Sequence, residues 1–90
     1  MPDPSAAQPS LRPADLCETM QFDPHEGIVE LDTHLDRLYA AAEQGRFRFD
    51  RHSARNELQA ATFGRKQAAS VRLLLSPSGA MAIQVSAVSD

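Results

Sequence analysis

The sequence is poor in the residues that disulfide frameworks and metal centres require. Its 90 residues include one cysteine, Cys17, and three histidines. A single cysteine excludes an internal disulfide and is typical of a reducing compartment. The spacings of His25, His34 and His52 match no zinc pattern, and no base adjoins Cys17 to activate its thiol. We therefore expect no bound metal and rank a histidine-based metalloenzyme last among the alternatives.

Long apolar runs and clusters of basic residues are also missing. No stretch approaches the ~20 apolar residues that a membrane helix needs, and the N-terminus lacks the pattern of a signal peptide. The net charge is −3 and the basic residues are scattered, which argues against nucleic-acid binding. The four glycines are isolated turn residues and form no phosphate-binding loop. These features predict a cytoplasmic protein without membrane or nucleic-acid partners.

Length and composition allow one small domain. Tryptophan is absent and tyrosine occurs once, so the core must consist of aliphatic residues, methionine and four phenylalanines. Residues 1–13 contain four prolines among Ser, Ala and Gln, without apolar periodicity. We expect a disordered or extended leader there and a single α+β domain over residues 14–90.

The first half of this domain is expected to form a hairpin followed by a helix. Residues 14–22 predict a strand with Leu16, Met20 and Phe22 on one face, and residues 28–31 predict a short returning strand after a Pro-containing turn. Asp32 or Thr33 is expected to cap the next helix, with Asp36 completing a capping box. Its core stripe is Leu31, Leu35, Leu38 and Ala42, and Gly45 marks its end.

The second half predicts one more helix and two strands. Asp50 is the expected N-cap of this helix, Gly64 ends it, and its apolar face consists of Ala54, Leu58 and Ala61, with Thr62 at the margin. Residues 71–75 predict a well-covered central strand, and Met81, Ile83 and Val85 alternate with polar or small residues in a last strand. The order β-β-α-α-β-β favours a two-layer sandwich, an antiparallel sheet with two helices on one face.

The charged residues give few candidates for a reactive site. The acidic residues near the first helix are typical of helix starts, where carboxylates interact favourably with the helix dipole. Arg37 carries a permanent charge and a rigid fork of donors that suits phosphate. On spacing alone, however, an arginine beside the core stripe of a helix is typical of a solvated residue or an ion-pair partner.

A family resemblance makes Arg37 a stronger candidate for a phosphate contact. Residues 34–39, His-Leu-Asp-Arg-Leu-Tyr, resemble the His-Leu-x-Arg-Leu helix of the class IV aminotransferases, pyridoxal-phosphate enzymes that also include aminodeoxychorismate lyase. Residues 16–20, Leu-Cys-Glu-Thr-Met, resemble the first core strand of that family, and residues 71–75 resemble its arginine-containing strand. The resemblance covers residues 16–88 and is strongest before residue 49.

The resemblance implies a role for this chain as the small N-terminal domain of such an enzyme. Arg37 would contact the phosphate of pyridoxal phosphate, and the strand face with Cys17, Thr19 and Gln21 would look toward the substrate. Glu18 and His34 would fix the junction of strand and helix. Family members are usually homodimers, and a second, larger domain carries the lysine that binds the cofactor.

This chain departs from the family in two places. Gln21 stands where a basic residue is common, and Lys66 is the only lysine, in a polar connection that does not match the catalytic position. We therefore expect a fragment without activity of its own, part of an aminotransferase or a lyase. The alternative is a stand-alone interaction module that keeps the small-domain fold and associates with itself.

Overall fold

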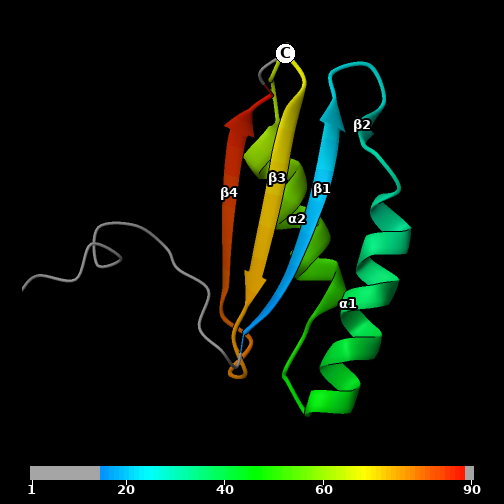
Figure 1. The fold of residues 1–90 in the computed structure, drawn as a ribbon, viewed down its shortest axis with the longest axis vertical. Helices are drawn as coiled ribbons and strands as arrows, with labels where there is room; N and C mark the ends of the chain where they lie inside the picture. Colours follow the sequence, from blue (N-terminus) through cyan, green and yellow to red (C-terminus); the bar gives the residue numbers. More distant parts are fainter. Residues whose placement is uncertain (1–14, 89–90) are drawn as a thin grey trace, which may run out of the picture.

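Residues 15–88 are described by a computed structural model, in which six elements form two layers (Figure 1). In chain order these are β1 (Leu16–Asp23), β2 (Gly27–Ile28), α1 (Leu31–Gly45), α2 (Arg51–Thr62), β3 (Ala69–Leu75) and β4 (Met81–Ala87). The four strands form one antiparallel sheet in the order β2-β1-β3-β4. This confirms the predicted α+β sandwich, while the leader expected over residues 1–13 lies outside the described residues.

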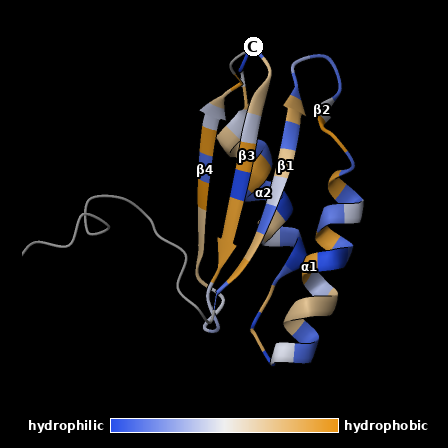
Figure 2. Cartoon of the chain, viewed as in Figure 1, coloured by the Kyte–Doolittle hydropathy of each residue, from blue (hydrophilic) through white to orange (hydrophobic). Residues whose placement is uncertain are grey.

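The core lies between one face of the sheet and the two helices. Residues on this face alternate along each strand, because successive side chains of a strand point to opposite sides. Met20 of β1 and Leu73 of β3 are almost completely buried there, against Leu35 of α1 and Leu58 of α2. In Figure 2, hydrophobic residues, coloured orange, recur along the strands and along α1. Strand β3 pairs on both sides, which confirms its predicted central position.

The hairpin between β1 and β2 is shorter than expected. Gly27 has φ 88°, a conformation that glycine adopts without steric cost, and the N–H of His25 donates to Asp23 Oδ1 at 2.8 Å. The predicted strand over residues 28–31 is wrong in extent: β2 ends at Ile28, because Glu30 turns into the left-handed region with φ 53° and Leu31 already begins α1.

The predicted N-terminal cap of α1 is also wrong. The N-cap residue is Glu30, not Asp32 or Thr33, and it makes no side-chain capping hydrogen bond. Asp36 completes no capping box with Thr33 and instead forms an ion pair with Arg51 of α2. The core stripe of α1 is confirmed by its buried members Leu35, Leu38 and Ala42 and by the partly buried Leu31, and the helix ends at Gly45 as expected.

Helix α2 begins as predicted and ends slightly earlier. Asp50 is its N-cap and accepts hydrogen bonds from the N–H groups of His52 and Ser53 at 3.0 and 3.2 Å. On the apolar face, Ala54 and Leu58 are buried as expected, but Thr62 is buried in place of Ala61. Thr62 can occupy this position because its hydroxyl donates to the carbonyl of Leu58 at 3.0 Å, which satisfies a buried polar group. No helix among residues 15–88 is long and apolar enough to cross a bilayer.

Truncation of Leu58 tests the core packing. This side chain is completely buried, so Leu58→Ala is expected to lower the free energy of unfolding by about 2–5 kcal/mol through lost burial and the cavity left behind. Urea denaturation followed by circular dichroism measures this change. The neighbouring exposed residue provides the control: Gln59→Ala is expected to change stability by less than about 0.5 kcal/mol. Equal losses in both variants would contradict the packing.

The cap at Asp50 makes stability depend on pH. The hydrogen bond from the backbone N–H of Ser53 lowers the pKa of Asp50 below its ordinary value of 3.8. The contribution of the charged cap is therefore present above pH 3.8 and is lost as the pH falls through the lower pKa of the folded state. Asp50→Asn keeps an oxygen acceptor that does not titrate. We expect the stability advantage of the wild type over this variant to shrink in urea denaturation series below pH 3.8, and parallel pH profiles would contradict it.

Candidate functional site

The face of the sheet opposite the helices carries the predicted substrate-side residues. Both helices lie on one side, so the alternate residues of β1, β3 and β4 form what we call the open face. Cys17 is partly buried there, and Thr19 and Gln21 are exposed. The structure thus places the three predicted residues together on one strand. The members of the open face are Cys17, Thr19, Gln21, Ser70, Arg72, Leu74, Ala82, Gln84 and Ser86.

Arg72 is the charged residue of this open face, and the sequence analysis did not single it out. In the sheet register it lies opposite Thr19 of β1 on one side and Gln84 of β4 on the other, so that the three residues form a polar row across the strands. Its Nε donates to the Sγ of Cys17 at 3.3 Å. The signal that could have found it is the alternation of β3, which places Arg72 out of phase with the buried Val71 and Leu73.

The junction between β1 and α1 is formed by Glu18 and His34. The imidazole Nδ1 lies 2.6 Å from Oε1 of Glu18, and the side chains are only 16% and 14% exposed. A partly buried hydrogen bond to a carboxylate fixes the relative position of the two elements more firmly than a surface contact does. This contact joins the two residues that were expected to fix the junction, and it explains why Glu18 is tolerated on the apolar side of β1.

Helix α1 has two polar flanks with different partners. Asp32 and Asp36 face α2, where they pair with Arg55 and Arg51. His34 faces β1, and Arg37 lies three residues further along, on the same flank of the helix. Arg37 is exposed, and it makes no ion pair or hydrogen bond to another residue within the range 15–88. The structure therefore places Arg37 on the side of α1 that borders β1, with its guanidinium available to a ligand.

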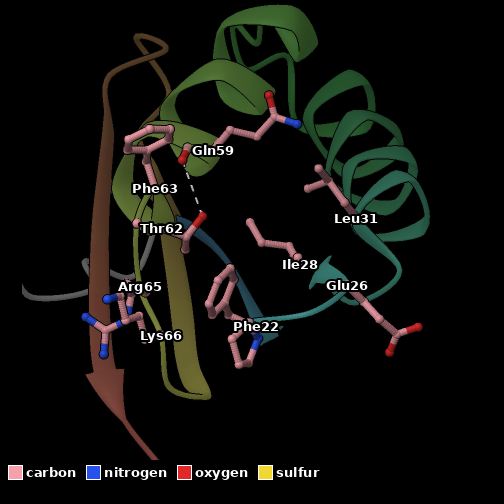
Figure 3. Close-up of a pocket in the computed structure, with 12 residues that line it drawn as sticks. Phe22, Glu26, Ile28, Leu31, Gln59, Thr62, Phe63, Arg65 and Lys66 are labelled. Atoms are coloured by element: carbon pink, nitrogen blue, oxygen red, sulfur yellow. Dashed lines mark hydrogen bonds between the residues drawn. The ribbon is translucent and has the colours of Figure 1, made fainter.

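Lys66 lies in a different part of the molecule. It is exposed in the connection between α2 and β3, next to Arg65, and lines a groove of about 560 Å³ between the β1–β2 turn and the end of α2. In Figure 3, Ile28 and Leu31 point into this groove, while Glu26 and Lys66 lie at its margin. Arg37 is not among the residues that line it. The fold thus keeps Lys66 away from the cation that was predicted to bind phosphate.

A second groove lies at the other end of α1, between Tyr39 and Phe49. The Tyr39 hydroxyl donates to the carboxylate of Glu43, and this hydrogen bond raises the pKa of Tyr39 above its ordinary value of 10.0. Neither groove is lined by a serine, a cysteine or a histidine. Within residues 15–88, no group of three or more potential ligands is arranged to hold a metal ion. Arg72 on the open face and Arg37 on the helix side of the sheet each offer a positive charge that suits an anionic ligand.

Comparison with known proteins gives one informative result. No protein-family model matches the chain, and no curated protein matches its sequence. A crystal structure of a candidate amino-acid aminotransferase from Mesorhizobium loti matches it with a TM-score of 0.77 and 29% sequence identity. The match covers 83% of this chain and 36% of the other, so that the chain spans about a third of the length of the aminotransferase. In its fold, this chain is therefore an aminotransferase-like domain.

Proposed function

We propose that this chain is the small domain of a class IV pyridoxal-phosphate enzyme and forms one wall of the cofactor and substrate site. The observation that carries the proposal is the position of Arg37. It is a cation without a partner among residues 15–88, on the flank of α1 that borders β1, and β1 carries polar residues of the open face. The similarity in fold to an aminotransferase supports the same assignment.

Arg37 suits the cofactor phosphate because no carboxylate in the described part of the chain pairs with its charge. Arg51 and Arg55 of α2 are partly exposed on the opposite flank of α1, but both are engaged by carboxylates of α1. A guanidinium binds a phosphate through two parallel hydrogen bonds and keeps its charge at every physiological pH. The hydrogen bond between His34 and Glu18 would hold the flank that carries Arg37 against β1.

The open face would meet the substrate. Thr19 and Gln21 offer exposed hydrogen-bonding groups, and Arg72 brings a positive charge to the same face, held next to Cys17. An amino-acid substrate carries a carboxylate, for which an arginine is a suitable partner. In this assignment Arg72 supplies the positive charge that a basic residue at the position of Gln21 would supply.

The chain supplies only part of the required chemistry. Bound pyridoxal phosphate acts as an electron sink that stabilises a carbanion at the substrate. The lysine that attaches it would come from a second domain, because Lys66 is exposed at the margin of a groove that Arg37 does not reach. We propose that the complete enzyme is a homodimer and that it transfers an amino group or acts as a lyase, while this chain alone is inactive.

The alternative, a self-associating interaction module, is favoured by a separate observation. Several large apolar side chains are exposed on the surface, Phe63 most of all at 89%, followed by Tyr39 at 47%, Val88 at 45% and Val29 at 40%. The strongly exposed ring of Phe63 leaves apolar surface that a partner could cover. An interaction module would need neither Arg37 nor Arg72, so variants at these positions distinguish the two functions.

Substitution of Arg37 tests the phosphate contact. Arg37→Gln removes the charge and retains a polar side chain. We expect the dissociation constant for pyridoxal phosphate to rise about tenfold, because a hydrogen bond to a charged group contributes about 1.5–3 kcal/mol. Titration of the full chain with pyridoxal phosphate, followed by NMR of the backbone amides, measures the binding and locates it.

The matched control is Arg46→Gln, at an exposed arginine beyond the end of α1. It is expected to leave the dissociation constant unchanged. Equal weakening by both substitutions would indicate attraction by overall charge, and an absence of saturable shifts around Arg37 in the wild type would show that the chain lacks the phosphate site.

Chemical trapping tests the expected lack of a cofactor lysine. We incubate the chain with pyridoxal phosphate, reduce with borohydride, and quantify modification of Lys66 by mass spectrometry of peptides. The labelling is expected to rise linearly with cofactor concentration, at the rate of an ordinary exposed lysine, because Lys66 lacks the desolvated setting of a Schiff-base lysine. The variant Lys66→Arg, which has no lysine at this position, gives the background of labelling elsewhere in the chain. Rapid and saturable labelling of Lys66 would refute the claim that the chain lacks a catalytic lysine.

A further inference from the structure

Strand β4 forms an edge of the sheet without the usual protection. Among the described residues it pairs only with β3. Its seven residues, Met81–Ala87, read MAIQVSA and include neither a charge nor a proline. Exposed N–H and C=O groups of an edge strand recruit further strands, so natural edges are usually short, charged, bulged or covered. Strand β4 is long enough and regular enough to accept another strand.

The opposite edge of the sheet is protected in the ways that β4 is not. It consists of β1 and of β2, which is only two residues long. Glu18 places a carboxylate on the inner side of β1, and α1 lies alongside that strand and holds this carboxylate through His34. Short edges and inward-pointing charges both discourage pairing with another chain. The two edges thus differ, and only the edge at β4 is suited to association.

The apolar residues of β4 are incompletely covered. Met81, Ile83 and Val85 face the helices and pack against the core, but all three remain partly exposed. Their partners in β3, Leu75, Leu73 and Val71, are completely buried. Helix α2 contacts β4 but does not cover it fully. Figure 2 shows hydrophobic residues along β4 at the side of the sheet where no further element lies among the described residues. Another strand and its helix would complete this burial.

We propose that β4 pairs with β4 of a second copy of this chain, so that two sheets join into one. In the antiparallel register that uses the whole strand, Gln84 lies opposite its own equivalent, Ile83 opposite Val85, and Met81 opposite Ala87. Each pair joins residues of the same face, so the helices of both copies lie on the same side. Because β4 carries no charge, this pairing places no like charges opposite each other. The strand is thereby complementary to itself.

The exposed Phe63 fits this arrangement. It follows the last turn of α2, at the end of the sheet where β4 finishes, and 89% of its surface is exposed. Antiparallel pairing brings the Met81 end of the second copy to this end of the sheet. Contact with the second copy would cover the phenylalanine ring. Among the large apolar side chains of the described residues, this one has the greatest exposed fraction. The interface uses neither Arg37 nor Arg72 and does not depend on the proposed cofactor role.

A charge-swap experiment tests the pairing. Gln84 lies on the open face, away from the core, so Gln84→Lys places two ammonium groups opposite each other and Gln84→Glu places two carboxylates there. Each variant alone is expected to raise the dimer dissociation constant by roughly a factor of five, since like charges directly opposite each other are unfavourable. An equimolar mixture is expected to restore association to the wild-type level or beyond. Sedimentation velocity across a concentration series measures the dissociation constants of the two variants and of their equimolar mixture.

The matched control is Gln44→Lys, an identical change at an exposed position near the end of α1, which is expected to leave the dissociation constant unchanged. Restored association in the mixture also shows that both Gln84 variants are folded. The proposal is overturned if the wild type stays monomeric at high micromolar concentration, if Gln84→Lys associates like the wild type, or if the mixture fails to recover.

Discussion

Every candidate residue of this chain takes its place from the packing of both helices on one face of the sheet. The buried residues of β3 require this packing, because the side chains of Val71, Leu73 and Leu75 all lie on the same side of the sheet and must be covered there. With that side filled, the alternate positions of the strands form a second surface that neither helix covers. Arg72 and Cys17 meet on it because the register of β1 and β3 brings them together, not because they are close in the sequence.

Helix α1 shows how a few contacts leave one residue free. Its apolar stripe binds the sheet, its acidic flank binds the arginines of α2, and His34 binds Glu18 of β1. These three contacts fix both the position of the helix and its rotation about its axis. Arg37 then projects from the flank beside β1 without a partner of its own among the described residues. An unpaired arginine at this position is better suited to bind a ligand than an arginine that is engaged by a carboxylate.

The sequence predicted what depends on local periodicity and missed what depends on register. The alternation in residues 71–75 and the helical stripe of Leu35 and Leu38 were sufficient for the architecture. The cap of α1 failed because Glu30 in a left-handed conformation, with no side-chain signal, starts the helix before Thr33. The contact of Arg72 with Cys17 joins residues 55 positions apart and required the pairing of β1 with β3.

The open face and the edge at β4 meet at Gln84, but pairing of two β4 strands uses the edge and leaves the open face uncovered, so occupation of one does not exclude occupation of the other. In the antiparallel pairing of two β4 strands, residues of the same face lie opposite each other, and the two open faces become neighbours on one side of a continuous sheet. The polar row that begins at Thr19 and passes through Arg72 would then reach Gln84 at the junction and continue into the second copy. Association at β4 would therefore join two faces that are proposed to bind an anionic ligand without covering either, because the helices stay on the other side of the sheet.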